Sequence, residues 1–161
     1  MKTIPDQNMM LETPPSGPSG VERRFGLAGV FGALGVEATP VRCGKFELKQ
    51  KLGEGAMGVV YVATDGELGR DVALKLLRTT RGYESLRREA RALARLNHPN
   101  VVQVLGVGEA EGQTWIAMEL IEGGTLAEWS EVHPPAGRER YQRALDLLLA
   151  AGRGLAAAHR A

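Results

Sequence analysis

The chain has 161 residues, of which 43% are hydrophobic and 24% are charged, and its formal net charge is +1. This composition is typical of one globular domain, and so small a net charge favours neither nucleic acid nor an anionic membrane as a partner. The single cysteine, Cys43, excludes an internal disulfide and a cysteine-built metal site and indicates a reducing, cytoplasmic setting, and the three widely spaced histidines predict no metal cluster.

Residues 1–43 differ in composition from the rest of the chain. The run TPPSGPSG at residues 13–20 is rich in turn formers and of low complexity, so we expect residues 1–43 to form a mostly disordered leader. A linker or an overcalled start codon explains the leader more simply than a docking arm, although all three readings stay open. The apolar stretch Phe25–Val36 is too short to span a membrane, which needs about 20 apolar residues, and we expect no targeting role for it.

Strand patterns begin after Gly44. Phe46 and Leu48 open a first strand, and the β-branched and aromatic run Val59–Ala63 predicts a second strand beyond a glycine-rich turn. Asp71–Leu77 predicts a third strand. The elements expected after it are a helix through Leu86, Ala90 and Leu93, strands at Val101–Gly108 and Trp115–Leu120, a short helix at Thr125–Trp129, and a long helix from Arg138 to about His159.

The turn at residues 53–58, GEGAMG, matches the pattern G-x-G-x-x-G. Its third glycine, Gly58, is followed by a strand sequence, whereas the third glycine of a dinucleotide-binding fold opens a helix. No Gly-Lys-Ser/Thr follows, so the turn is not a Walker loop either. A glycine turn between antiparallel strands can fold over phosphates, because without β-carbons its backbone N–H groups approach them closely. On this turn alone, a plain glycine-rich hairpin is an equally good interpretation.

The segment Val72–Lys75, VALK, resembles the V-A-I-K strand of protein kinases. Together with the glycine turn, it makes the chain from about Phe46 to Ala161 resemble a bacterial protein kinase of the eukaryotic Ser/Thr type. The resemblance implies an α+β fold, in which an antiparallel five-stranded sheet and one long helix form a kinase N-lobe. It places the N-lobe and hinge at residues 44–124 and the start of a truncated C-lobe at residues 125–161.

The same resemblance implies ATP as the nucleotide. Lys75 would contact its α- and β-phosphates and pair with Glu89 of the next helix, with Glu84 as the alternative partner about one turn earlier. The backbone carbonyl of Glu119 and the backbone N–H of Ile121 would read the adenine edge. The implied nucleotide-binding residues are Leu52, Gly53, Gly55, Gly58, Val60, Ala73, Lys75, the gatekeeper Met118, Glu119 and Ile121.

Two kinase motifs are absent from the 161 residues. H-R-D-x-x-x-x-N orients the substrate hydroxyl, and its asparagine and the D-F-G aspartate hold Mg²⁺. The terminal His159-Arg160-Ala161 is not read as a degraded H-R-D, because it matches the end of the preceding long helix. We therefore expect Mg²⁺ only in a full-length enzyme, no metal ligand in this chain, and no turnover by this chain alone.

Three interpretations remain. The chain is part of a Ser/Thr kinase whose protein substrate is unknown, or a non-catalytic half-kinase that binds a nucleotide or a partner, or a decayed fragment. Tyrosine specificity is not excluded, because the segments that distinguish it lie downstream of these residues. No nucleic acid partner and no membrane segment are expected.

Overall fold

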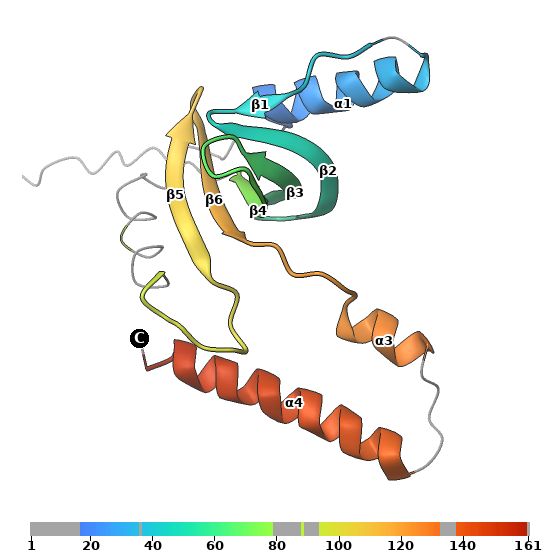
Figure 1. Cartoon of the computed structure of the whole chain (residues 1–161), viewed down its shortest axis with the longest axis vertical. Helices are drawn as coiled ribbons and strands as arrows, with labels where there is room; N and C mark the ends of the chain where they lie inside the picture. The colour runs from blue at the N-terminus through green and yellow to red at the C-terminus, as the bar shows by residue number, and fades with distance from the viewer. Residues whose placement is uncertain (1–16, 36, 79–87, 89–93, 133–137, 161) are drawn as a thin grey trace, which may run out of the picture.

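The computed structural model describes residues 17–35, 37–78, 88, 94–132 and 138–160. Its centre is one antiparallel sheet with the strand order β1-β2-β3-β4-β6-β5 (Figure 1). The strands are β1 (Arg42–Cys43), β2 (Phe46–Gly55), β3 (Gly58–Asp65), β4 (Arg70–Leu77), β5 (Val104–Ala110) and β6 (Gln113–Glu119). The helices in the described part are α1 (Gly20–Ala33), α3 (Leu126–Val132) and α4 (Arg138–Ala158).

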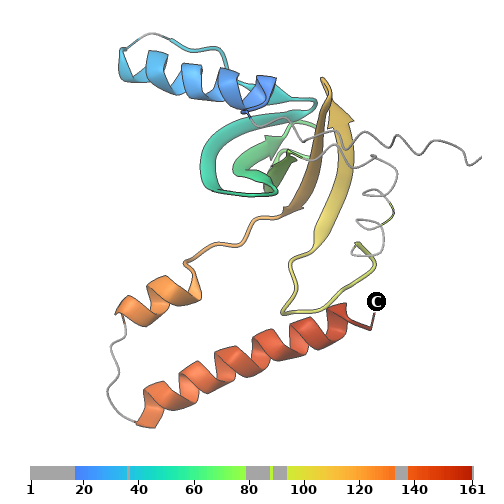
Figure 2. The same ribbon diagram turned by 180° about the vertical axis from the view of Figure 1, so that it is seen from behind.

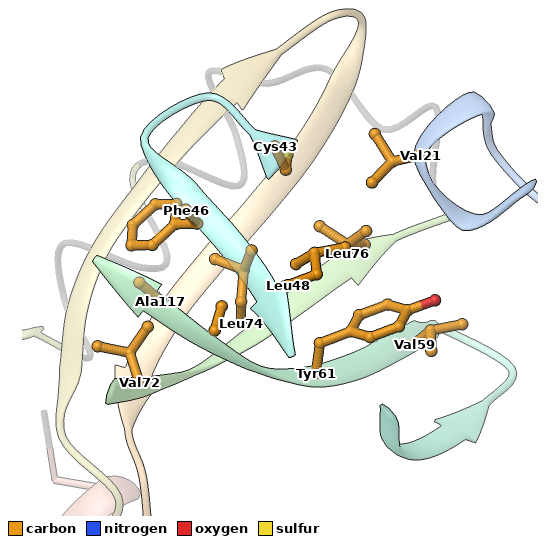
Figure 3. Close-up of a cluster of buried hydrophobic side chains, with 11 residues drawn as sticks. Val21, Cys43, Phe46, Leu48, Val59, Tyr61, Val72, Leu74, Leu76 and Ala117 are labelled. Carbon is orange, nitrogen blue, oxygen red and sulfur yellow. The ribbon is translucent and has the colours of Figure 1, made fainter. Parts of the chain in front are cut away.

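The core lies on one face of this sheet. Side chains alternate between the two faces of a strand, and residues directly opposite each other on paired strands share a face. The pairs Val59↔Leu76 and Tyr61↔Leu74 thus place four buried side chains together. Figure 3 shows this cluster, whose buried members are Val21, Cys43, Phe46, Leu48, Val59, Tyr61, Ala63, Val72, Leu74, Leu76 and Ala117.

Helix α1 stands where a disordered leader was expected. The Ser19 hydroxyl accepts a hydrogen bond from the Glu22 amide at 3.2 Å, and the Ser19 amide donates to the Glu22 carboxylate at 3.1 Å. This is a capping box, which satisfies amides that a helix start leaves unpaired. Val21 is only 2% exposed and joins the sheet core, and the Phe25 ring meets Tyr61 edge-on at 4.8 Å between centroids. Capping and burial outweigh the low helix propensity of the glycines. The expectation of a disordered leader is therefore corrected for residues 20–33, which form a helix.

The remaining elements differ from expectation mainly at their bounds. The sheet has six strands where five were expected, because the two-residue strand β1 pairs with β2. Strand β5 begins at Val104 rather than Val101. The helix expected through Leu86, Ala90 and Leu93 lies outside the described residues. Thus the meander β2–β3–β4 and the hairpin β5–β6 follow the predicted order.

Helices α3 and α4 lie away from the sheet, beyond the segment that follows β6 (Figure 2). The end of α4 contacts the turn at Asn100, since a β-carbon on Gly154 would lie 2.4 Å from the Asn100 carbonyl oxygen. Much of the apolar surface of α4 is exposed, including Leu145 and Leu148. Within the described residues, no helix is long and apolar enough to cross a membrane.

Candidate functional site

The sheet face opposite the core carries the residues expected at the site. Val60 of β3 pairs with Lys75 of β4, which pairs in turn with Ile116 of β6. Ala73, two residues before Lys75 and therefore on the same face, likewise pairs with Val62 of β3 and with Met118 of β6. Opposed residues share a face, so an apolar surface surrounds a single lysine there. The structure therefore brings Val60, Ala73, Lys75 and Met118 together as expected.

Lys75 is half-buried on this face. Within the part of the chain that the structure describes, no carboxylate forms an ion pair with its ammonium group. Glu89 and its alternative Glu84 both lie outside the described residues. The Lys75–Glu89 ion pair consequently stays a prediction.

The three glycines of the turn differ in what the fold requires of them. Gly55 and Gly58 pair across the end of the hairpin, which leaves Ala56 and Met57 at its tip. Gly58 has φ +146°, and a β-carbon there would lie 2.0 Å from the Leu76 carbonyl oxygen of β4. A β-carbon on Gly53 or Gly55 would meet nothing within 4 Å. The fold therefore needs glycine at position 58, whereas at positions 53 and 55 the backbone is open to an approaching ligand.

Three charged residues, Lys51, Glu54 and Arg78, fasten the hairpin, and none of these contacts was predicted from the sequence. The Arg78 amide, just beyond β4, donates to the Met57 carbonyl at 3.2 Å. The Arg78 guanidinium also donates to the carboxylate of Glu54, which is paired with Lys51 at 2.5 Å as well. Hydrogen bonds from Lys51 and Arg78 lower the pKa of Glu54 to about 2. No motif marks Arg78, because its contact with Glu54 spans 24 positions and exists only once β2, β3 and β4 have paired.

The end of β6 supplies backbone groups beside this face. The Glu119 amide donates to the Gln103 carbonyl at 3.0 Å, and the Gln103 amide donates to the Glu119 carboxylate at 2.8 Å. The Ile121 amide has no hydrogen-bond acceptor among the described residues. Ile121 is 61% exposed, and Leu52, at the start of the glycine turn, is 49% exposed. Apolar side chains and a free backbone donor at one edge suit a flat heterocycle.

Two hollows of the described structure lie elsewhere. One of about 560 Å³ and one of about 640 Å³ lie beside α1, where Arg24, Leu27 and Glu111 line both. Neither is lined by any of the expected site residues. Helices α3 and α4 lie away from the sheet (Figure 1), and on the expected face Ala73 is buried while Val60, Lys75 and Met118 are half-buried. No group of His, Cys, Asp or Glu side chains in the described residues could hold a metal ion.

Comparison with known proteins gives consistent matches. The family model described as "Protein kinase domain" matches residues 46–160. The serine/threonine-protein kinase PknA of Mycobacterium tuberculosis is 38% identical over 128 residues, which is 73% of this chain and 29% of that protein. Serine/threonine-protein kinase 1 of Arabidopsis thaliana is 41% identical over 101 residues, covering 61% of this chain and 12% of that protein.

A solved structure of the Mycobacterium tuberculosis PknI kinase domain matches with a TM-score of 0.63 and 28% sequence identity. The match covers 76% of this chain and 51% of that chain. The 161 residues thus span less than a third of these two curated relatives and about half of a solved kinase domain.

Proposed function

The chain belongs to the protein kinase domain family, and from this we propose that residues 44–124 are the ATP-binding lobe and hinge of a serine/threonine protein kinase. The full-length enzyme would transfer a phosphoryl group from ATP to serine or threonine hydroxyls of a protein. Residues 125–161 would begin its second lobe. The matched relatives PknA and serine/threonine-protein kinase 1, both named serine/threonine-protein kinases, support this choice over tyrosine specificity.

The observation that carries the proposal is the arrangement of Lys75 relative to the glycine hairpin. Lys75 lies on the sheet face opposite the core and pairs with Val60, which follows the hairpin by two residues. Gly53 and Gly55 have open space where a β-carbon would be, so nothing in the described fold demands glycine there. A ligand whose phosphates lie against bare backbone amides and one ammonium group explains all three residues.

Each residue then has a role in holding ATP. Lys75 would contact the α- and β-phosphates, with Glu89 as its partner, and the hairpin amides would cover the phosphates. Leu52, Val60, Ala73 and Met118 would enclose the adenine ring. The carbonyl of Glu119 and the free amide of Ile121 would pair with the adenine edge. Bound there, ATP would supply the transferable phosphoryl group.

The residues present do not fit the Mg²⁺ ions that kinases use. The 161 residues contain neither H-R-D-x-x-x-x-N nor D-F-G, and no metal-binding group occurs in the described part. Positioning and charge neutralisation supply most of the catalysis of phosphoryl transfer. We therefore propose that a polypeptide of these 161 residues binds ATP but does not turn it over. We also propose a cytoplasmic location, which the single cysteine supports.

The test compares ATP binding by the 161-residue chain and by its Lys75→Met variant, using calorimetry. Loss of one charge-assisted contact of about 1.5–3 kcal/mol should raise the Kd for ATP about tenfold or more. Lys49→Met is the matched control, because in the described structure the exposed Lys49 forms an ion pair with Asp71 alone, near the start of β4 and far from the hairpin tip. Equal ATP affinity in a folded Lys75→Met variant would overturn the assignment.

The same samples separate the remaining interpretations. ATP binding without phosphoryl transfer to a generic protein substrate is the expected result. Transfer above the blank would refute the proposal that these residues are inactive alone. No ATP binding by a folded chain would leave a partner-binding half-kinase or a decayed fragment.

A further inference from the structure

Arg78 joins the glycine hairpin to helix α1. Its guanidinium donates to Glu54, the residue between Gly53 and Gly55, and its NH2 nitrogen lies 3.6 Å from a carboxylate oxygen of Glu22. Its amide holds Met57 at the hairpin tip. One residue thus contacts the β2 side of the hairpin, the hairpin tip and the first turn of α1.

The Glu22 carboxylate is held in place by the start of α1. Its side chain is 5% exposed, and the capping box with Ser19 fixes one of its oxygens. Val21 is buried in the sheet core next to it, as Figure 3 shows, and Phe25 packs on Tyr61 one turn later. A carboxylate fixed in this way is an anchor that an exposed, freely rotating glutamate could not provide.

The Arg78 guanidinium contacts two carboxylates, those of Glu22 and Glu54, rather than one. The second Glu22 oxygen and the Arg78 Nε are both buried, and neither has a hydrogen-bond partner among the described residues. Leaving a buried donor and acceptor unpaired costs free energy, and a guanidinium turned fully toward Glu22 could make a two-point contact instead. The observed arrangement gives up that contact while Arg78 binds Glu54.

We propose that α1 positions the glycine-rich hairpin through Arg78, with Glu22 and Arg78 acting as positioning residues for the phosphates of ATP. The ligand in this inference rests on the proposed function. Arg78 does two things: it fixes the backbone around Gly53 and Gly55, and it offsets the Glu54 charge where the phosphates would lie. Loosening Arg78 therefore weakens phosphate binding and leaves adenine binding unchanged.

The first experiment measures amide hydrogen exchange of the nucleotide-free 161-residue chain. Glu22→Gln is the test variant, because glutamine keeps the capping-box acceptor while removing the charge. Glu47→Gln is the control, since the one ion pair of Glu47 in the described part of the chain is with the exposed Arg42. We expect exchange at residues 53–58 to rise about threefold to fivefold in Glu22→Gln alone, the range of a weak ion pair. Unchanged or slower exchange there would overturn the inference.

The second experiment compares the affinities of ATP and adenosine in the same variants. Glu22→Gln and Arg78→Met should raise the Kd for ATP about threefold to tenfold, with the Kd for adenosine constant. Arg78→Lys should recover part of the ATP affinity, because it restores the charge. Equal losses for both ligands would indicate general destabilisation and overturn the positioning role. If wild-type chain binds no ATP, the proposed function fails, while the exchange result still decides the link between α1 and the hairpin.

Discussion

Replacing Gly58 by alanine should destabilise the fold, whereas replacing Gly53 or Gly55 should affect only a bound ligand. A β-carbon at position 58 would lie 2.0 Å from the Leu76 carbonyl oxygen and 3.1 Å from the Leu77 Cα. Both contacts are with backbone, which cannot rotate aside as a side chain could. Strand pairing of Gly58 with Gly55 and with Leu77 also prevents the hairpin from moving away without losing ladder contacts.

The loss of unfolding free energy expected for Gly58→Ala has two parts. Holding alanine at φ +146° costs about 1–3 kcal/mol, and the overlap with β4 costs about 1–3 kcal/mol more. We expect Gly58→Ala to lower the free energy of unfolding by about 2–6 kcal/mol, a fall in Tm on the order of 10 °C at this chain length. Gly55→Ala should change it by less than about 1 kcal/mol, because its β-carbon meets nothing within 4 Å.

The assay is urea and thermal denaturation of both variants by circular dichroism, followed by ATP titration of whichever variants remain folded. Gly55→Ala should keep the stability of the wild type and lose ATP affinity, whereas Gly58→Ala should lose stability first. Two variants of equal stability would refute the steric argument. A stable Gly55→Ala variant with unchanged ATP affinity would contradict the role given to the open glycines.

Two further predictions concern titratable groups. Lys51 and Arg78 lower the pKa of Glu54 to about 2 from an ordinary value of 4.5, so its stabilising contribution is complete above pH 4.5 and is lost as pH falls toward 2. The difference in unfolding free energy between wild type and Glu54→Gln should therefore shrink over that pH range in urea titrations, and a constant difference would contradict it. Burial raises the pKa of the Cys43 thiol to about 11, so a disulfide reagent at pH 8 should label Cys43 only as fast as the chain unfolds. Immediate labelling of the folded chain would show that Cys43 is accessible.

The central sheet was predictable because its strands carry their own pattern. Val59–Ala63 is β-branched and aromatic, and it lies inside β3 as expected. The predicted strand Asp71–Leu77 corresponds to β4 within one residue, so Lys75 was correctly placed within a strand. These residues were identified because hydrophobic alternation and the kinase resemblance agreed at each of them.

Helix α1 and Arg78 could not be predicted in the same way. The glycines of α1 argue against a helix, and its stability comes from burying Val21 in a sheet that follows it in sequence. Its capping box, Ser19 and Glu22, is the one local sign that could have located its start. Arg78 has no local sign at all, because its role depends on two acids that are 24 and 56 positions away.

Strand β1 and the helix beside it also affect how the sheet ends. A long exposed edge strand can pair with a strand of another molecule and so begin aggregation. At this edge only Arg42 and Cys43 form the outer strand, and the Arg42 carbonyl accepts a hydrogen bond from Arg24 of α1 at 3.3 Å. Where β1 covers β2, at Phe46 and Glu47, few backbone groups therefore remain for a foreign strand. The segment before the sheet thus shields the first residues of β2 from pairing with another molecule.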